Sequence, residues 1–113
     1  MVTIFHNPRC GKSRECLAFL DQSKEEIKVV NYLFNPPTYE DLRAIIQLLQ
    51  IKPIELVRQK ESIWISDFKN KSMSDTEVIQ AMVQNPILIE RPIVINGNKA
   101  VIARPYDKAK AIL

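Results

Sequence analysis

The sequence lacks several features that mark specialised classes of protein. With two cysteines and one histidine among 113 residues, a single chain cannot assemble a closed Cys₂His₂ or Cys₄ zinc site. No run of like charges reaches five residues, and 16 Lys and Arg against 13 Asp and Glu leave a net charge of only +3. This balance does not indicate a nucleic-acid-binding surface.

Membrane and export signals are also missing. No apolar stretch approaches the roughly 20 residues that a bilayer span requires, and the first residues lack a basic region followed by a long apolar one. We therefore expect a cytoplasmic protein, in which lone thiols stay reduced, with no membrane or nucleic-acid partner. The composition, 46% hydrophobic and 26% charged, is typical of one soluble domain that needs no disulfide or metal to stabilise its core.

The N-terminal third predicts a β-α-β unit. Residues 2–5 form a β-rich run that Asn7-Pro8 ends, and residues 11–21 have helix-compatible patterning. Residues 27–33 form an apolar, β-branched run that ends before a proline pair, which predicts a second strand. Strands joined through a helix are expected to be parallel with a right-handed crossover.

The middle of the chain predicts a helical insertion at about residues 38–85. Thr38 with Asp41 and Ser74 with Glu77 are N-terminal capping signals that precede apolar residues at helical spacing. Between these two helices, residues 52–72 have weak periodicity, so we expect short helical turns and loop with an exposed Trp64.

The C-terminal segment predicts a hairpin and a last helix. Residues 92–95 and 99–103 are short β-like runs around Asn96-Gly97-Asn98, and residues 106–113 can form a helix. The expected fold is α/β: β-α-β, a helical insertion, then β-β-α, in one domain over residues 1–113. Such a domain has a mixed sheet with helices on both faces.

The densest chemistry lies at residues 6–14, where a strand ends and a helix begins with Cys10 at the junction. Unpaired N–H groups at a helix N-terminus bind oxyanions and lower the pKa of a thiol. Three basic residues of the same segment add positive charge: Arg9, Lys12 and Arg14. Cys10 is therefore a candidate nucleophile.

The spacing of residues around Cys10 excludes three similar motifs. A phosphate-binding P-loop requires a glycine where His6 stands, and a C-x-x-C motif requires a cysteine where Ser13 stands. The loop of the low-molecular-weight phosphatases requires an arginine at the position of Cys16. Cys16 lies about 9 Å along the helix from Cys10, too far for a disulfide, so it reads as core. Cys10 is expected to act as a single thiol.

Four motifs in order resemble the glutaredoxin-dependent arsenate reductase family across nearly the whole chain. They are N-P-R-C-G-K-S-R at 7–14, L-V-R-Q-K at 56–60, N-P-I-L-I-E-R-P-I-V at 85–94 and A-R-P at 103–105. The chain resembles a compact member without the longer C-terminal tail of others. The resemblance implies a thioredoxin-like fold with Cys10 as nucleophile and an oxyanion-binding trio: Arg58, Arg91 and Arg104.

Four other residues take supporting positions in that resemblance. His6 stands where the family has a residue that favours the thiolate, and Asn7 and Ser13 lie in the same motif. Pro92 follows Arg91, and the corresponding X-Pro bond of thioredoxin-like folds is cis and faces the nucleophile, which would point Arg91 into the site.

The activity implied is reduction of arsenate to arsenite, a step in arsenic detoxification. Cys10 would form an arsenic adduct that glutathione attacks, and glutaredoxin would take the resulting mixed disulfide. Glutathione is then a co-substrate, and no metal or tightly bound cofactor is required of the monomer. Two alternatives stay open: reduction of another small electrophile, and a regulator resembling Spx-type proteins, which bind the C-terminal domain of the RNA polymerase α-subunit. Sensing members of that group commonly carry C-x-x-C, whereas this chain has Ser13.

Overall fold

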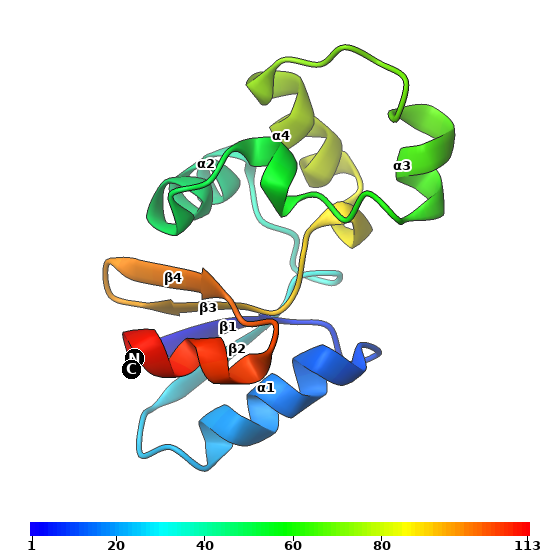
Figure 1. Cartoon of the computed structure of the whole chain (residues 1–113). Coiled ribbons are helices and arrows are strands. Elements are labelled where there is room, and N and C mark those ends of the chain that lie inside the picture. The colour runs from blue at the N-terminus through cyan, green and yellow to red at the C-terminus, as the bar shows by residue number, and fades with distance from the viewer. The chain divides into compact units, whose positions relative to one another are not determined.

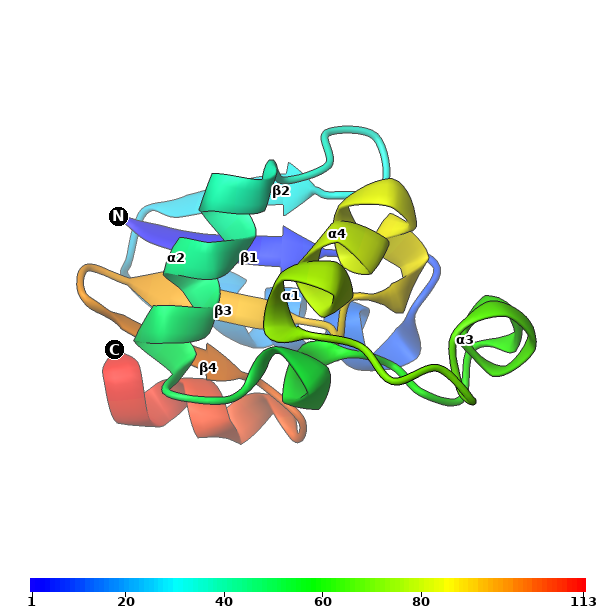
Figure 2. The same ribbon diagram turned by 90° about the horizontal axis from the view of Figure 1, so that it is seen from above.

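The computed structural model describes all 113 residues, and the chain divides into two compact units. One unit joins both ends of the chain, residues 1–35 and 91–113, and the other comprises residues 36–90. The strands of the first unit and the helices of the second are seen from two directions in Figures 1 and 2. The second unit contains the helices of the expected insertion and begins and ends a few residues outside it.

A four-stranded mixed sheet forms the centre of the terminal unit. Its strands are β1 (Val2–His6), β2 (Ile27–Asn31), β3 (Ile93–Asn96) and β4 (Lys99–Ile102), in the order β2-β1-β3-β4. β1 pairs with β2 in parallel and with β3 antiparallel, and β3 pairs with β4 antiparallel. The expected parallel β-α-β unit and C-terminal hairpin are both present. Gly97, at the hairpin turn, has a φ of 61°, a conformation that glycine adopts without strain.

Two helices pack together on one face of this sheet (Figure 1). α1 (Gly11–Asp21) has the bounds that the sequence predicts. The C-terminal segment η3 (Tyr106–Ile112) is a 3₁₀-helix, so the expected helix is present but is wound more tightly. Between the two helices and the sheet lies a cluster of fully buried side chains: Val2, Ile4, Cys16, Leu20, Val94, Ala103 and Ala109.

The second unit consists of helices joined by loops, with one isolated β-bridge between Val57 and Ile89. Its two longest helices are α2 (Tyr39–Leu49) and α4 (Asp75–Gln84), and the reciprocal capping bonds expected at Thr38 and Ser74 are both formed. Three shorter helices connect and follow them: η1 (Pro53–Leu56), α3 (Ser62–Asp67) and η2 (Pro86–Leu88).

Trp64 is buried, and the expectation that it is exposed was wrong. Its side chain is only 5% exposed, and its ring stacks on that of Phe68 with centroids 5.4 Å apart. Polar neighbours along the chain suggested a solvated position, but α3 directs Trp64 inward while those neighbours face water. One inward-facing residue of a six-residue helix leaves too little periodicity for the sequence to show its burial.

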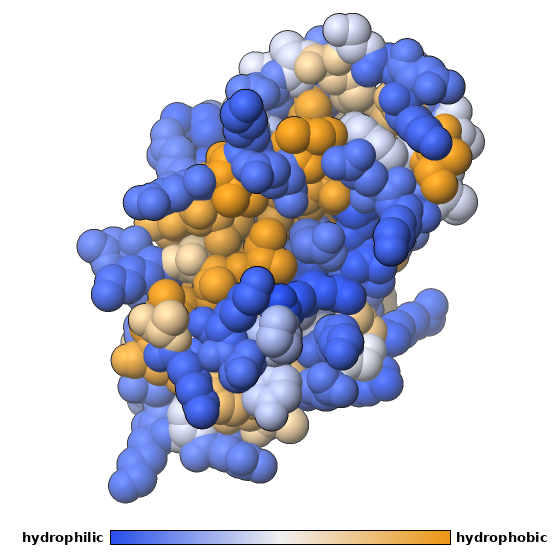
Figure 3. All heavy atoms as spheres, viewed as in Figure 1, coloured by the Kyte–Doolittle hydropathy of each residue, from blue (hydrophilic) through white to orange (hydrophobic).

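Hydrophilic side chains cover much of the face shown in Figure 3, with apolar ones gathered at several places. Six large apolar side chains stay exposed: Met1, Val29, Phe34, Ile65, Tyr106 and Leu113. None of the helices has the length and apolar character needed to cross a bilayer.

Candidate active site

Cys10 is the N-cap of α1 and directly follows a tight turn. Its φ of −97° and ψ of 121° are extended, so the chain enters the helix with the partly buried thiol at the first turn. The Cys10 N–H donates to the Asn7 carbonyl at 3.0 Å, and the Arg9 N–H donates to the buried Asn7 side-chain oxygen at 3.0 Å. Asn7 therefore fixes the turn that presents the thiol.

Ser13 joins this turn to the end of β1. Its fully buried Oγ accepts the Asn7 N–H at 3.0 Å and lies 2.7 Å from His6 Nδ1. The residue that replaces the second cysteine of a C-x-x-C motif thus has a structural contact of its own. His6 and Asn7, also buried, are held against the first turn of the helix through this hydroxyl.

Arg14 makes a contact that the sequence reading did not anticipate. Its Nη1 donates to the Pro8 carbonyl at 2.9 Å, so the side chain reaches back across the turn. Helical side chains point toward the N-terminus of their helix, and this tendency could have predicted the contact from the sequence.

The Cys10 thiol has a lowered pKa. Burial of the sulfur acts to raise the pKa, but the Ser13 N–H, the Arg91 guanidinium and the Lys12 N–H favour the thiolate and together outweigh burial. The side chains of Arg9, Lys12 and Arg14 are exposed, so solvent and salt screen their charges. The positive side chain that acts on Cys10 comes from the other end of the chain.

Arg91 reaches Cys10 from the segment before β3. Its side chain is 9% exposed, and the Arg91-Pro92 peptide bond is cis. The Arg104 guanidinium donates from Nη1 to the Arg91 carbonyl at 3.2 Å, and the Ala103 N–H donates to the Pro92 carbonyl at 2.9 Å. The structure therefore places the Arg91 guanidinium beside Cys10 and the Arg104 side chain against the Arg91 carbonyl, so that the backbone of Arg91 and Pro92 is held from the end of β4.

His6 contacts Ser13 rather than the sulfur. Burial and the nearby Arg14 guanidinium lower the pKa of His6, while Ser13 acts to raise it. The imidazole is accordingly neutral at pH 7.

Cys16 is a fully buried core residue, as its position on the helix predicts. Burial raises the pKa of its thiol to about 11, and both cysteines are free. A neutral, enclosed thiol is a poor nucleophile. Of the two cysteines, Cys10 is the less buried and the one whose thiol has a lowered pKa.

Arg58 belongs to the helical unit, where two carboxylates contact it. Its Nε lies 3.3 Å from Glu61 Oε1 and its Nη1 lies 2.9 Å from Glu90 Oε1. Burial acts to lower the Arg58 pKa, but Glu90 and Glu61 raise it, so the guanidinium stays charged.

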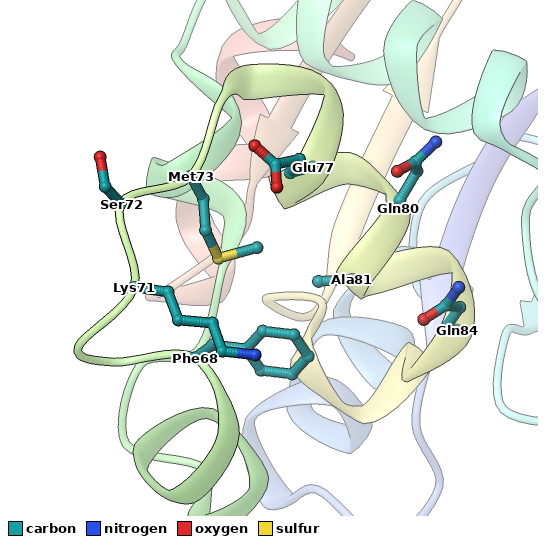
Figure 4. Close-up of a pocket in the computed structure, with 8 residues that line it drawn as sticks. All are labelled: Phe68, Lys71, Ser72, Met73, Glu77, Gln80, Ala81 and Gln84. Atoms are coloured by element: carbon teal, nitrogen blue, oxygen red, sulfur yellow. The ribbon is translucent and has the colours of Figure 1, made fainter.

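A separate open cavity of about 410 Å³ lies in the helical unit (Figure 4). The Phe68 ring and the Met73 side chain border it from the segment before α4, and Gln80 and Gln84 border it from α4 itself. None of the candidate site residues predicted from the sequence lines this cavity. No group of three or more His, Cys, Asp or Glu side chains in the structure could hold a metal ion.

Comparison with known proteins identifies the family and the fold of the chain. Residues 5–112 match the model of the ArsC family. The chain is 43% identical to an uncharacterized protein, YfgD, of Escherichia coli, covering 99% of this chain and 96% of that protein. It is 38% identical to an arsenate reductase of Haemophilus influenzae, covering 99% and 98% of the two chains. The solved structure of a putative arsenate reductase from Yersinia pestis superimposes with a TM-score of 0.94 at 40% identity, over 99% of this chain and all of that one.

These matches extend over the whole fold and confirm the predicted α/β, thioredoxin-like class, here with a single cysteine at the start of the first helix. The chain belongs to the ArsC family.

Proposed function

We propose that this protein is an arsenate reductase that uses Cys10 as its nucleophile and glutathione with glutaredoxin as its reductants. The observation that carries the proposal is the Cys10 thiol, whose pKa is lowered at a helix N-terminus beside the Arg91 guanidinium. Relatives that match over the full length are named arsenate reductases, which supports arsenate as the substrate.

The first step forms a bond between sulfur and arsenic. The Cys10 thiolate attacks arsenic in arsenate, and one arsenate oxygen leaves as water after taking up protons. Arg91 and Arg104 bind the oxyanion, because a planar guanidinium donates two parallel hydrogen bonds and keeps its charge. Arg58 is the third arginine of the proposal, on the strength of the family motif that contains it. His6, Asn7, Ser13 and Pro92 support the turn and the Arg91 backbone.

The second step transfers electrons. Glutathione attacks the Cys10 sulfur of the adduct, a disulfide forms between Cys10 and glutathione, and the electron pair of the S–As bond stays on arsenic, which leaves as arsenite. Two sulfur atoms are each oxidised by one electron and arsenic gains two. Glutaredoxin then removes the glutathionyl group by thiol–disulfide exchange and restores the Cys10 thiolate. The proposal needs no resident metal or cofactor and places a monomer in the cytoplasm, where these thiols are available.

A coupled assay tests this function. Wild-type protein is incubated with arsenate, glutathione, glutaredoxin, glutathione reductase and NADPH, with NADPH absorbance and arsenite as readouts. We expect NADPH oxidation that requires arsenate, and none above background with Cys10→Ser, because a neutral alcohol is a far weaker nucleophile than a thiolate. Absence of arsenite from the wild-type reaction, or equal turnover by Cys10→Ser, contradicts the proposal.

A further inference from the structure

The Arg58 side chain is already engaged in the resting protein. Glu61 contacts its Nε at 3.3 Å and Glu90 contacts its Nη1 at 2.9 Å. The three side chains are only 22%, 24% and 25% exposed, so solvent and salt screen these pairs less than pairs at the open surface. An oxyanion that binds Arg58 must compete with these two carboxylates.

The positions of the contacts decide the kind of competition. A guanidinium offers two forks to a bidentate acceptor, Nε with Nη2 on its side and Nη1 with Nη2 at its end. Glu61 accepts from Nε, which belongs to the side fork, and Glu90 accepts from Nη1, which belongs to the end fork. Nη2 belongs to both forks and makes no hydrogen bond. A tetrahedral oxyanion can therefore accept two hydrogen bonds from one fork only after one carboxylate moves away.

The charges around Arg58 also oppose oxyanion binding. Each carboxylate places a negative charge beside Arg58, and these charges disfavour the approach of a doubly charged oxyanion to Nη2. Removal of either carboxylate would remove one of these charges and free one nitrogen of a fork.

We propose that Glu61 and Glu90 set the oxyanion affinity of this protein by occupying Arg58, so that arsenate or a similar tetrahedral anion binds Arg58 only by displacing one of them. The inference rests on the proposed function in one respect, that Arg58 takes part in oxyanion binding. If Glu61 and Glu90 occupy Arg58 in this way, loss of either carboxylate tightens oxyanion binding.

A purely structural role for these pairs predicts a different result. The segments of Arg58 and Glu90 are already joined by backbone hydrogen bonds, from the Arg58 N–H to the Leu88 carbonyl at 2.7 Å and from the Glu90 N–H to the Leu56 carbonyl at 2.8 Å. Because these bonds do not need the carboxylates, Glu→Gln variants are expected to fold. If the pairs only stabilise the unit, such variants lose stability and gain no affinity.

The experiment measures sulfate binding by isothermal titration calorimetry, because sulfate is tetrahedral, doubly charged and not reduced by thiols. The variants are Glu90→Gln, Glu61→Gln, Arg58→Gln and the double variant Arg58→Gln/Glu90→Gln. Glu40→Gln is the matched control, since Glu40 pairs with Arg43 at 3.0 Å on the exposed surface of α2. Thermal unfolding verifies that each variant is folded.

We expect Glu90→Gln and Glu61→Gln each to lower the sulfate Kd about threefold to tenfold, and Glu40→Gln to leave it unchanged. The gain should vanish in the double variant, because it requires Arg58. An unchanged or higher Kd in both single variants, including no detectable binding by either, overturns the inference, and so does a gain that persists without Arg58.

The same proteins distinguish this inference from the proposed function. Tighter sulfate binding by the Glu→Gln variants with no arsenite produced by the wild type supports the inference and contradicts the reductase. Arsenite production with unchanged sulfate binding supports the reductase and contradicts the inference.

Discussion

Groups from two distant parts of the chain activate the Cys10 thiol. Backbone N–H groups of the first helical turn come from its own segment, whereas the guanidinium comes from Arg91, which directly precedes the hairpin strands. Arg104 in turn donates to the Arg91 carbonyl. The thiolate is thus stabilised by local and long-range contacts, and substitution can separate the two.

The rate of Cys10 alkylation, measured as a function of pH, distinguishes the local contacts from the long-range contact with Arg91. In a Cys16→Ala background, which leaves one thiol, iodoacetamide labelling of Cys10 is followed by intact mass. We expect an inflection below that of a free cysteine, because the lowered pKa of Cys10 leaves more thiolate at neutral pH. Arg91→Gln should move the inflection upward, since it removes a charge that favours the thiolate.

The matched control is Arg9→Gln, which removes an exposed arginine one residue from the thiol. It should leave the inflection close to that of the parent protein, since solvent and salt screen the exposed Arg9 charge. Equal upward shifts in both variants would mean that net charge, rather than the Arg91 contact, sets the pKa.

Charge alone is not expected to satisfy the oxyanion. Arg91→Lys keeps a positive charge beside Cys10 but loses the planar fork, so we expect kcat/KM for arsenate to fall at least about tenfold. The coupled NADPH assay measures the change. Lys28→Arg, at an exposed position of β2, controls for an exchange between basic residues and should be neutral. Full activity in Arg91→Lys would remove bidentate binding by Arg91 from the proposal.

At the scale of elements, helices with strong local signals were predicted well. The capping pairs at Thr38 and Ser74 start their helices where expected, and α1 has the expected bounds. These features depend on residues within one helical turn of one another, so the sequence contains them directly. The tight winding of η3 and the burial of Trp64 depend on packing, which short segments do not encode.

The site shows the same division. Cys10 could be found from the sequence because a cysteine between a strand and a helix is a local feature. The contact of Arg91 with Cys10 joins residues far apart in the chain, and before the fold was known only the family resemblance indicated it. The carboxylates on Arg58 were not anticipated, because Glu90 is 32 positions away and nothing in its own segment points to Arg58.

One element-scale prediction concerns the start of α2. The Thr38 side chain accepts the Asp41 N–H at 3.1 Å, and Asp41 accepts the Thr38 N–H at 3.0 Å. Thr38→Ala leaves a helix N–H unpaired and should lower the free energy of unfolding by about 1 kcal/mol. Urea unfolding followed by circular dichroism measures the loss. Ser72→Ala, on an exposed loop, should change it by less than about 0.5 kcal/mol, and an equal loss in both would contradict the capping role.

At the scale of the whole molecule, the chain places its thiol chemistry in a unit built from both of its ends. β1 and α1 supply Cys10 and its turn, and the segment beginning at Arg91 supplies the facing guanidinium and closes the sheet. Because strand pairing and the active-site contacts involve the same segments, unfolding this unit removes the activated thiol as well. The stability of the fold and the reactivity of Cys10 should therefore change together with pH.

His6 gives this coupling a defined direction. Burial and Arg14 lower its pKa in the folded protein, whereas in the unfolded chain it has its ordinary value of 6.5. Above that value the imidazole is neutral in both states and the full stability is present. As pH falls below it, the unfolded chain binds a proton before the folded protein does, so the free energy of unfolding decreases until the folded pKa is passed.

We therefore expect a lower urea midpoint at pH 5.5 than at pH 7.5, with a smaller difference in His6→Asn. Both proteins carry Cys10→Ser, so that thiol ionisation does not contribute, and the interval lies above the ordinary pKa of carboxylates. A pH dependence in His6→Asn as large as that of its parent would show that another group is responsible. A midpoint that rises on acidification would mean that the folded protein favours the imidazolium, and that His6 acts at the site as a cation.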